Sequence, residues 1–497
     1  MKKVMALFAV LAICFSCADE QKLNNEEEIA SNVTLLNGHI TNYNLQDSIY
    51  EIPIYIHDWV EGQQEFKTAI DSVGNFSISL PIDNQQDIGV YYKNWLKVIV
   101  KGGEKLDLSF DGSKKITSEV YASAHVTGKS ENINNTLFNY MAGNPINMSN
   151  FYETSNAMEP TEYKAYYDSI YDRKNKYIDA FITENELPVE LKTWIQVERD
   201  IEPIETLLAY KMFNPMARKY PDQIKSNDFL ATINETPRLK EVMFVNSSLA
   251  SFANYYTYDR YTTYLDQQTI EVTRENVDSL RLASLTTSNK DNPVLQQLTV
   301  NEYLKNKFAN NELEVYNDNK SLFNTIVKGS FFEEKHLAKV QEIEKLLANP
   351  ELSDKSELLS FNTEDSKKYI DEIIENANGK VVYIDHWATW CGPCRSEFKN
   401  STPALKEKFK GQVEFVYFCY QSPEKNWKPM ISKYNIEGKH YFIEKDDNED
   451  LFKQVNLEGF PTYTIINKNG EIVESNFEYR PSNPETSLIL QKLIEEN

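Results

Sequence analysis

The fold of the last part of this chain is decided by the segment Val381-Val382-Tyr383-Ile384-Asp385-His386-Trp387-Ala388-Thr389-Trp390-Cys391-Gly392-Pro393-Cys394-Arg395. Its apolar first half predicts a buried strand, and the proline after Cys391 predicts the first turn of a helix. Two thiols at a helix start, two residues apart, can close a disulfide with little backbone movement. The helix N-terminus also favours a thiolate at the first cysteine. The segment therefore predicts dithiol–disulfide exchange.

A CxxC pair can also bind zinc, which would need two further ligands. Cys419 and His386 are the only nearby candidates, and no second CxxC follows Cys394. We therefore expect no metal and no prosthetic group.

Length and charge limit the classes of protein that the chain can represent. Its 497 residues are enough for about three domains. The formal net charge of −23 argues against nucleic acid or an anionic membrane surface as a partner, because both need clustered Lys and Arg.

The N-terminus predicts a targeting segment. Met1-Lys2-Lys3 is basic, and the apolar run that follows, residues 4–15, is too short to span a bilayer. The segment resembles a bacterial lipoprotein signal, in which a small residue precedes the cysteine that becomes lipidated. Ser16 before Cys17 fits that pattern, so we expect residues 1–17 to be a signal peptide with Cys17 lipidated, and residues 18–32 to be a tether.

The cysteine count indicates chemistry rather than a structural framework. Two of the five cysteines lie in the predicted signal, two form the CxxC, and Cys419 remains. A lipid-anchored chain would live outside the cytosol, where disulfides persist, yet no structural disulfide can be built. We expect Cys419 to be an inert core residue.

Three regions follow the tether. Residues 33–127 contain short alternating segments separated by turn signals such as Lys101-Gly102-Gly103, which predict an antiparallel β-sandwich-like domain. Residues 128–350 change to helical spacing, with prolines between the helices. Residues 351–497 alternate strand and helix, which predicts an α/β domain. We expect a single helix over residues 394–409.

The third region resembles the thioredoxin superfamily, specifically the TlpA-like thiol–disulfide oxidoreductases. The likeness rests on Asp385, Trp387-Ala388, the run Trp390-Cys391-Gly392-Pro393-Cys394, and Gly459-Phe460-Pro461-Thr462. It covers residues 351–497 and implies a thioredoxin fold. The whole layout is similar to multidomain TlpA-like lipoproteins of Bacteroidetes.

The resemblance assigns roles to these residues. It implies that Cys391 is the exposed attacking thiolate and Cys394 the buried resolving thiol. Asp385 matches the buried carboxylate that exchanges a proton with the resolving thiol, and burial would raise its pKa toward neutrality. Pro461 matches the family's cis-proline. The implied substrate-binding residues are Trp390, Gly392, Pro393, Phe460 and Pro461.

Two positions depart from the family pattern. His386 stands where relatives often have Phe, and on a strand it points away from Asp385, so we expect it to pack in the core. Lys399 stands where many relatives kink the helix with proline, and Pro403 follows one turn later.

We therefore expect a protein-disulfide reductase that is lipid-anchored in the cell envelope and faces the periplasm. Its substrate would be a disulfide-containing protein, and a membrane thiol donor would return electrons to it. A net oxidase or isomerase would use the same residues. The alternative from another class is a surface lipoprotein that binds glycan or peptide and carries a minor redox module.

Overall fold

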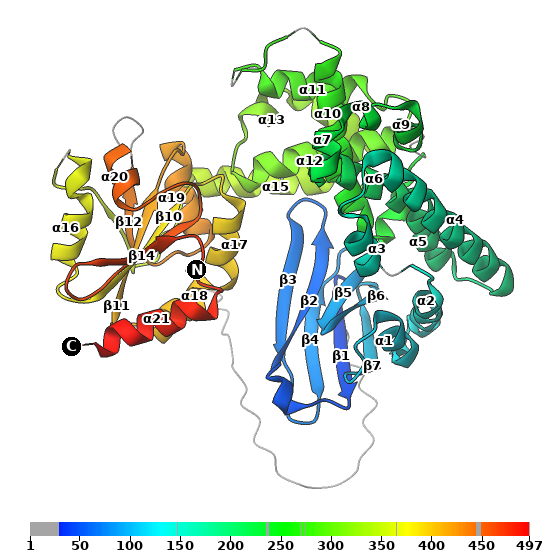
Figure 1. Cartoon of the computed structure of the whole chain (residues 1–497), viewed down its shortest axis with the longest axis horizontal. Helices are drawn as coiled ribbons and strands as arrows, with labels where there is room; N and C mark the ends of the chain where they lie inside the picture. Colours follow the sequence, from blue (N-terminus) through cyan, green and yellow to red (C-terminus); the bar gives the residue numbers. More distant parts are fainter. Residues whose placement is uncertain are drawn as a thin grey trace, which may run out of the picture.

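The computed structural model describes residues 29–496 apart from 147, 235–237, 269, 274, 364 and 444–448. Figure 1 shows three parts: a β-rich region, a thioredoxin-like region beside it, and helices that arch over both. The predicted signal peptide, Cys17 and most of the predicted tether lie outside the described residues. None of the helices that the described residues form is long and apolar enough to cross a membrane.

The β-rich region contains two four-stranded sheets, with strand orders β4-β1-β7-β8 and β3-β2-β5-β6. Inward-facing residues of both sheets, such as Leu36, Ile54 and Val98, form one hydrophobic core. The bounds are β1 Val33–Thr41, β2 Glu51–Asp58, β3 Gly62–Ala69, β4 Asn75–Pro81, β5 Gln86–Tyr92, β6 Asn94–Val100, β7 Glu104–Asp111 and β8 His125–Gly128, with η1 Leu45–Asp47 and α1 Thr117–Ser123.

The expectation of a purely antiparallel sandwich is wrong at one pair of strands. β1 and β7 are parallel, with Leu36 opposite Leu106. Parallel neighbours need a crossover connection. Here the chain crosses into the second sheet for β2 and β3, returns for β4, and crosses again for β5 and β6 before β7. This route brings β7 back in the direction of β1.

The middle region is helical. Its long helix α4, Pro160–Glu184, buries Tyr163, Tyr167 and Ile170 at helical spacing. The other helices are α2 Glu131–Gly143, α3 Met148–Ser155, α5 Val189–Asp200, α6 Glu202–Phe213, α7 Pro215–Lys219, α8 Pro221–Ile224, α9 Asn227–Asn234, η2 Glu241–Val245, α10 Ser248–Asp266, α11 Val277–Thr287, α12 Pro293–Ala309, α13 Glu314–Asp318, α14 Lys320–Val327 and α15 Glu333–Ala348.

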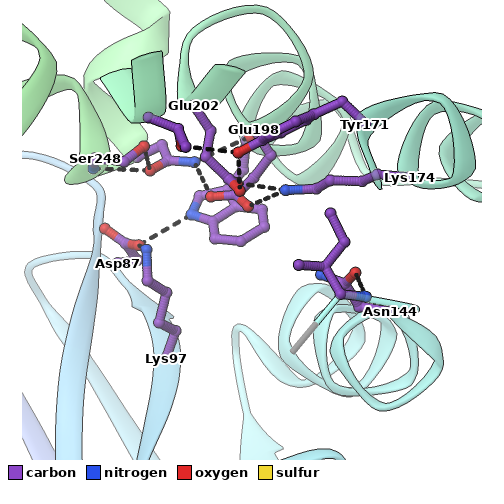
Figure 2. A network of polar contacts seen from close by, with 12 residues as sticks. Asp87, Lys97, Asn144, Tyr171, Lys174, Glu198, Glu202 and Ser248 are labelled. Carbon is purple, nitrogen blue, oxygen red and sulfur yellow. Dashed lines mark hydrogen bonds and ion pairs between the residues drawn. The ribbon is translucent and has the colours of Figure 1, made fainter. Parts of the chain in front are cut away.

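A network of buried charges joins the β-rich region to the helices (Figure 2). Asp87 of β5 forms an ion pair with Lys97 at 2.9 Å and accepts the Trp194 Nε1–H at 3.1 Å. On the helical side, the Lys174 ammonium contacts the carboxylates of Glu198, at 3.2 Å, and Glu202. We call Asp87, Lys97, Lys174, Glu198 and Glu202 the junction network.

The thioredoxin-like region is a six-stranded sheet of order β14-β13-β10-β11-β12-β9. β10 pairs parallel with β11 and antiparallel with β13, so it lies inside the sheet. The bounds are β9 Ser356–Leu359, β10 Val381–Trp387, β11 Val413–Cys419, β12 Gly438–Phe442, β13 Thr462–Ile466, β14 Ile472–Asn476, η3 Ser366–Lys368, α16 Tyr369–Asn376, α17 Gly392–Asn400, α18 Thr402–Lys408, α19 Glu424–Lys433, α20 Glu449–Gln454 and α21 Pro484–Glu495.

The single helix expected over residues 394–409 is two helices. α17 ends at Asn400, and α18 begins at Thr402 with Pro403 in its first turn. The backbone of Ser401 between them is not helical, with φ −131° and ψ −39°. Pro403 has no N–H to donate to the preceding turn, so the hydrogen bonding of α17 cannot continue through it and a new helix begins there.

Candidate active site

The CxxC lies where β10 meets α17. All seven residues of β10 are buried, and the chain leaves the sheet at Ala388 to enter the helix at Gly392. Cys391 is the N-cap residue, and its sulfur accepts the N–H of Cys394 at 3.2 Å. The two sulfurs are joined in a disulfide, with the Cα atoms 5.3 Å apart. An N-terminal cap position stabilises negative charge, so the reduced form favours a thiolate at Cys391.

The expectation of an exposed Cys391 is wrong for this disulfide form. Cys391 is 3% exposed and Cys394 is fully buried. The sulfur of Cys391 turns toward the helix, where it bonds to Cys394 and accepts a backbone N–H. Gly392 and Pro393, the two residues between the cysteines, are exposed.

Asp385 is completely buried two residues before the end of β10, and neither of its carboxylate oxygens has a hydrogen-bond partner among the described residues. Burial raises the pKa of Asp385 well above its usual range, and the nearby charge of Glu397 adds to the effect. A buried carboxyl group with a raised pKa and no fixed partners is a stronger base when ionised than an ordinary aspartate, and it can exchange a proton with a nearby thiol.

The cross-strand neighbours of Asp385 are Tyr417 on β11 and Tyr463 on β13. Both hydroxyl groups are also buried without partners among the described residues. Burial raises the pKa of both, so they stay neutral. The surroundings of Asp385 therefore offer polar atoms but no charge that would fix it as a carboxylate.

Glu397 is the residue that the sequence reasoning missed. It lies on α17 three residues after Cys394, on the same side of the helix, and is 7% exposed. Its carboxylate accepts the N–H and the hydroxyl of Ser482, at 2.9 and 2.7 Å. The sequence does contain a signal for this residue: a glutamate one helical turn after the second cysteine of the CxxC, next to the apolar Phe398.

An aromatic surface flanks the disulfide. Trp390 is 47% exposed and donates its indole N–H to the carbonyl of Gln421 at 2.8 Å. Its ring meets Phe460 edge-on at 5.7 Å, and the Phe460–Pro461 peptide bond is cis. Trp390 and Phe460 thus lie together beside the exposed Gly392-Pro393 turn.

His386 and Cys419 lie in the core, as expected. The two ring nitrogens of His386 contact the hydroxyls of Tyr420 at 2.8 Å and Thr464 at 2.9 Å. Burial lowers the pKa of His386 to about 3 and raises that of Cys419 to about 12. Neither group changes charge near neutral pH. The described residues hold no group of three or more His, Cys, Asp or Glu that could bind a metal ion.

The helical region borders the site through Arg395, the residue after Cys394. One guanidinium nitrogen donates to the carbonyls of Thr389 and Ala309, both at 3.1 Å, and to the side chain of Asn310. Asn426 of α19 also donates to the Asn310 carbonyl at 3.2 Å. The loop after α12 therefore contacts both the CxxC turn and α19.

Comparison with known proteins agrees with this geometry. The Redoxin family model matches residues 371–492. The chain is 28% identical over 102 residues to the thioredoxin-like protein YneN of Bacillus subtilis, covering 20% of this chain and 57% of YneN. It is 29% identical over 101 residues to the thiol-disulfide oxidoreductase ResA of Oceanobacillus iheyensis, covering 20% and 51%. The chain thus spans about half the length of these relatives.

Among solved structures, a protein from Bacteroides vulgatus described as a thiol-disulfide oxidoreductase is 32% identical; the match covers 24% of this chain and 78% of that one, with a TM-score of 0.22. The Redoxin match, residues 371–492, includes the CxxC. The C-terminal region therefore holds a Redoxin domain over residues 371–492 and is similar in sequence to thiol–disulfide oxidoreductases of the thioredoxin superfamily.

Proposed function

We propose that the protein is an extracytoplasmic, lipid-anchored protein-disulfide reductase that uses Cys391 and Cys394. The observation that carries the proposal is a CxxC disulfide at the N-terminus of α17 together with a fully buried, unpartnered Asp385 in the adjoining strand. The anchor at Cys17 and the periplasmic location are parts of the proposal that rest on the sequence.

The reaction begins with the reduced pair. The Cys391 thiolate attacks one sulfur of the substrate disulfide, which forms a mixed disulfide and expels the other substrate sulfur as a thiolate. Asp385, in its ionised form, then takes the proton of Cys394, and the resulting thiolate attacks the sulfur of Cys391. The second substrate sulfur leaves as a thiolate. Two electrons have moved to the substrate, and the Cys391–Cys394 disulfide remains for a membrane thiol donor to reduce.

The exposed surface beside the disulfide suits a polypeptide substrate. Trp390 and Phe460 offer rings, while Gly392 and Pro393 offer backbone without bulky side chains. We propose that the peptide groups around cis-Pro461 bind the substrate chain next to its disulfide. The loop at Asn310 contacts the CxxC turn through Arg395 and would limit how large a substrate can approach.

The test is trapping of the mixed disulfide in the full chain. Cys394→Ser should retain substrate on Cys391 as a stable mixed disulfide, whereas Cys391→Ser should lose reductase activity and trap nothing. Full activity of Cys391→Ser would end the proposal. The reduction potential of the pair, measured by thiol trapping in dithiothreitol buffers, decides direction: a strongly reducing value supports a reductase, and an oxidising value supports an oxidase or isomerase.

A binding role of the β-rich region is the second candidate. A cavity of about 460 Å³ between that region and α10 is lined by Tyr55, Trp95 and Ser248 among others. Trp95 is 48% exposed, and its ring lies 5.0 Å from that of Tyr55. Binding of oligosaccharides or peptides that is lost in Trp95→Ala, with disulfide reduction unchanged, would support this role.

A further inference from the structure

A lysine-rich cavity lies in the thioredoxin-like region, on the side of the sheet that α18 and α19 cover. Its volume is about 640 Å³, and it reaches α17 at Phe398, one turn beyond Cys394. Six lysines line it, against four glutamates: Lys355, Lys399, Lys406, Lys410, Lys433 and Lys439, with Glu357, Glu407, Glu414 and Glu437. This excess of positive charge is notable because the whole chain carries a formal net charge of −23.

Half of these lysines have carboxylate partners. Lys355 pairs with Glu437 at 3.1 Å, Lys410 with Glu407 at 3.1 Å, and Lys439 with Glu414 at 3.0 Å. The ammonium groups of Lys399, Lys406 and Lys433 have no carboxylate oxygen within 4.0 Å in the part of the chain that the structure describes.

The direct contacts of the three unpaired lysines are with neutral groups. Lys399 donates to the side-chain amide oxygen of Gln64, on β3 of the β-rich region, and Lys406 donates to the backbone carbonyl of Glu437. Lys433 lies 6.0 Å from the centre of the Tyr434 ring. All these partners are neutral groups, so none of them replaces a counter-ion.

Lys406 and Lys433, two of the three, are half-buried, so their ammonium groups are partly shielded from water. The Lys406 side chain lies over the rings of Phe415 and Tyr417, at 5.5 and 5.8 Å. Burial lowers the pKa of both Lys406 and Lys433 to about 8. Around Lys406, Lys355 lowers the pKa further, while Glu437 and Glu414 raise it.

Around Lys433, Lys339 and Arg395 lower the pKa, while Glu61 and Glu342 raise it. The net effect at both lysines is a desolvated ammonium group that costs free energy unless an anion lies beside it.

We propose that this cavity binds a small oxyanion with two or more negative charges, of the phosphate or polycarboxylate class, held by Lys399, Lys406 and Lys433. Lysine ammonium groups bind such anions as point charges. The cavity has room for a phosphate or citrate-sized molecule. This site is separate from the proposed disulfide chemistry, and its test does not depend on that chemistry.

The first test is calorimetric titration of the full chain with inorganic phosphate and with citrate, each compared with chloride at equal ionic strength. We expect saturable binding of at least one of the two. The double variant Lys406→Gln/Lys433→Gln should weaken it at least tenfold. The control Lys410→Gln, at the rim and paired with Glu407, should change it less than twofold. Saturation by phosphate alone assigns the phosphate class, and saturation by citrate alone the polycarboxylate class.

The second test works on the unaltered protein, so it stands even if the variant does not fold. Lysines with a pKa near 8 react faster with a neutral acetylating reagent at pH 8 than ordinary lysines do. We expect Lys406 and Lys433 to be acetylated ahead of Lys410, and the bound anion to slow their acetylation at least fivefold. Lack of saturable binding, equal weakening by Lys410→Gln, or binding without protection of Lys406 and Lys433 would each overturn the proposal.

Discussion

Two regions of this molecule bury ionisable side chains, and they differ in whether those side chains have partners. In the junction network, the Lys174 side chain is 2% exposed and contacts two carboxylates, those of Glu198 and Glu202. In the redox centre, Asp385 is fully buried and neither oxygen has a partner among the described residues.

The difference separates structural charges from chemical ones. A buried charge with fixed partners serves the fold, and removing a partner destabilises it. A buried acid without partners costs stability but changes protonation readily, which catalysis needs. The predictions below test that division, from the largest expected effect to the smallest.

Removal of the Lys174 charge should have the largest effect on folding. Lys174→Met keeps much of the side-chain volume but leaves Glu198 and Glu202 facing each other without a cation. We expect a loss of about 3–5 kcal/mol in the free energy of unfolding, because breaking a buried ion pair strands the remaining charge. Urea unfolding followed by circular dichroism measures it.

The matched control lies on the same helix. Lys176 pairs with Asp172 on the surface, where the two side chains are 75% and 63% exposed. Lys176→Met should change stability little, because solvent screens such pairs. Equal losses in the two variants would show that the junction network is not held by its buried charges.

Replacement of Asp385 should affect rate rather than folding. Asp385→Asn keeps the shape but cannot take the proton of Cys394, so we expect resolution of the mixed disulfide to slow by about 100-fold. The pH dependence of that step should also flatten. Single-turnover release of thiol from a preformed mixed disulfide measures both.

The exposed Asp371 on α16 provides the control, since Asp371→Asn should leave the rate unchanged. If Asp385→Asn unfolds readily but resolves mixed disulfides at the normal rate, Asp385 serves the stability of the fold and not the proton transfer.

The junction network, together with the neighbouring Glu205 of α6, should lose stability as pH rises. Burial raises the pKa of Glu205 to about 7, with the charge of Glu198 adding to it, and burial raises that of Glu202 to about 8. Lys174 opposes both shifts in part, and Lys97 also opposes that of Glu205. The folded state therefore binds these protons more tightly than the unfolded state, where a glutamate titrates near 4.5.

The sign follows from that difference. The stabilisation is complete below about pH 4.5 and is lost as pH rises through 7 to 8. We expect the free energy of unfolding to fall by about 2 kcal/mol between pH 5 and pH 8, and Glu205→Gln to remove part of the slope. If the free energy of unfolding of the wild type did not change between pH 5 and pH 8, favourable contacts would already offset the cost of burying the charges of Glu202 and Glu205.

The local chemistry of the redox centre could be predicted from the sequence because it depends on neighbours along the chain. The apolar run before Cys391 defines a strand, and the alternation of a strand places Asp385 and His386 on opposite faces. The strands of the β-rich region follow from alternation and turns in the same way.

The long-range pairings could not be predicted. Nothing in the local pattern of β1 shows that β7, about 70 residues later, returns parallel to it. Glu397 acts on Asp385 only because α17 packs on the sheet, and Arg395 meets Asn310 only because two regions dock. Such contacts depend on tertiary packing that periodicity does not record.

We expect the smallest effect on stability and activity from replacing His386. This residue follows Asp385 in the chain and is, like Asp385, fully buried. Both its nitrogens have partners, so it belongs with the junction network rather than with Asp385. His386→Phe keeps ring packing against Phe418 but strands the buried Tyr420 hydroxyl, which should cost about 1–2 kcal/mol. Because the pKa of His386 is already lowered to about 3, the pH dependence of disulfide exchange between pH 5 and 9 should not change. A shifted pH profile in His386→Phe would show that a buried group with hydrogen-bond partners can still take part in disulfide exchange. That result would contradict the division between buried groups that serve the fold and buried groups that serve the chemistry.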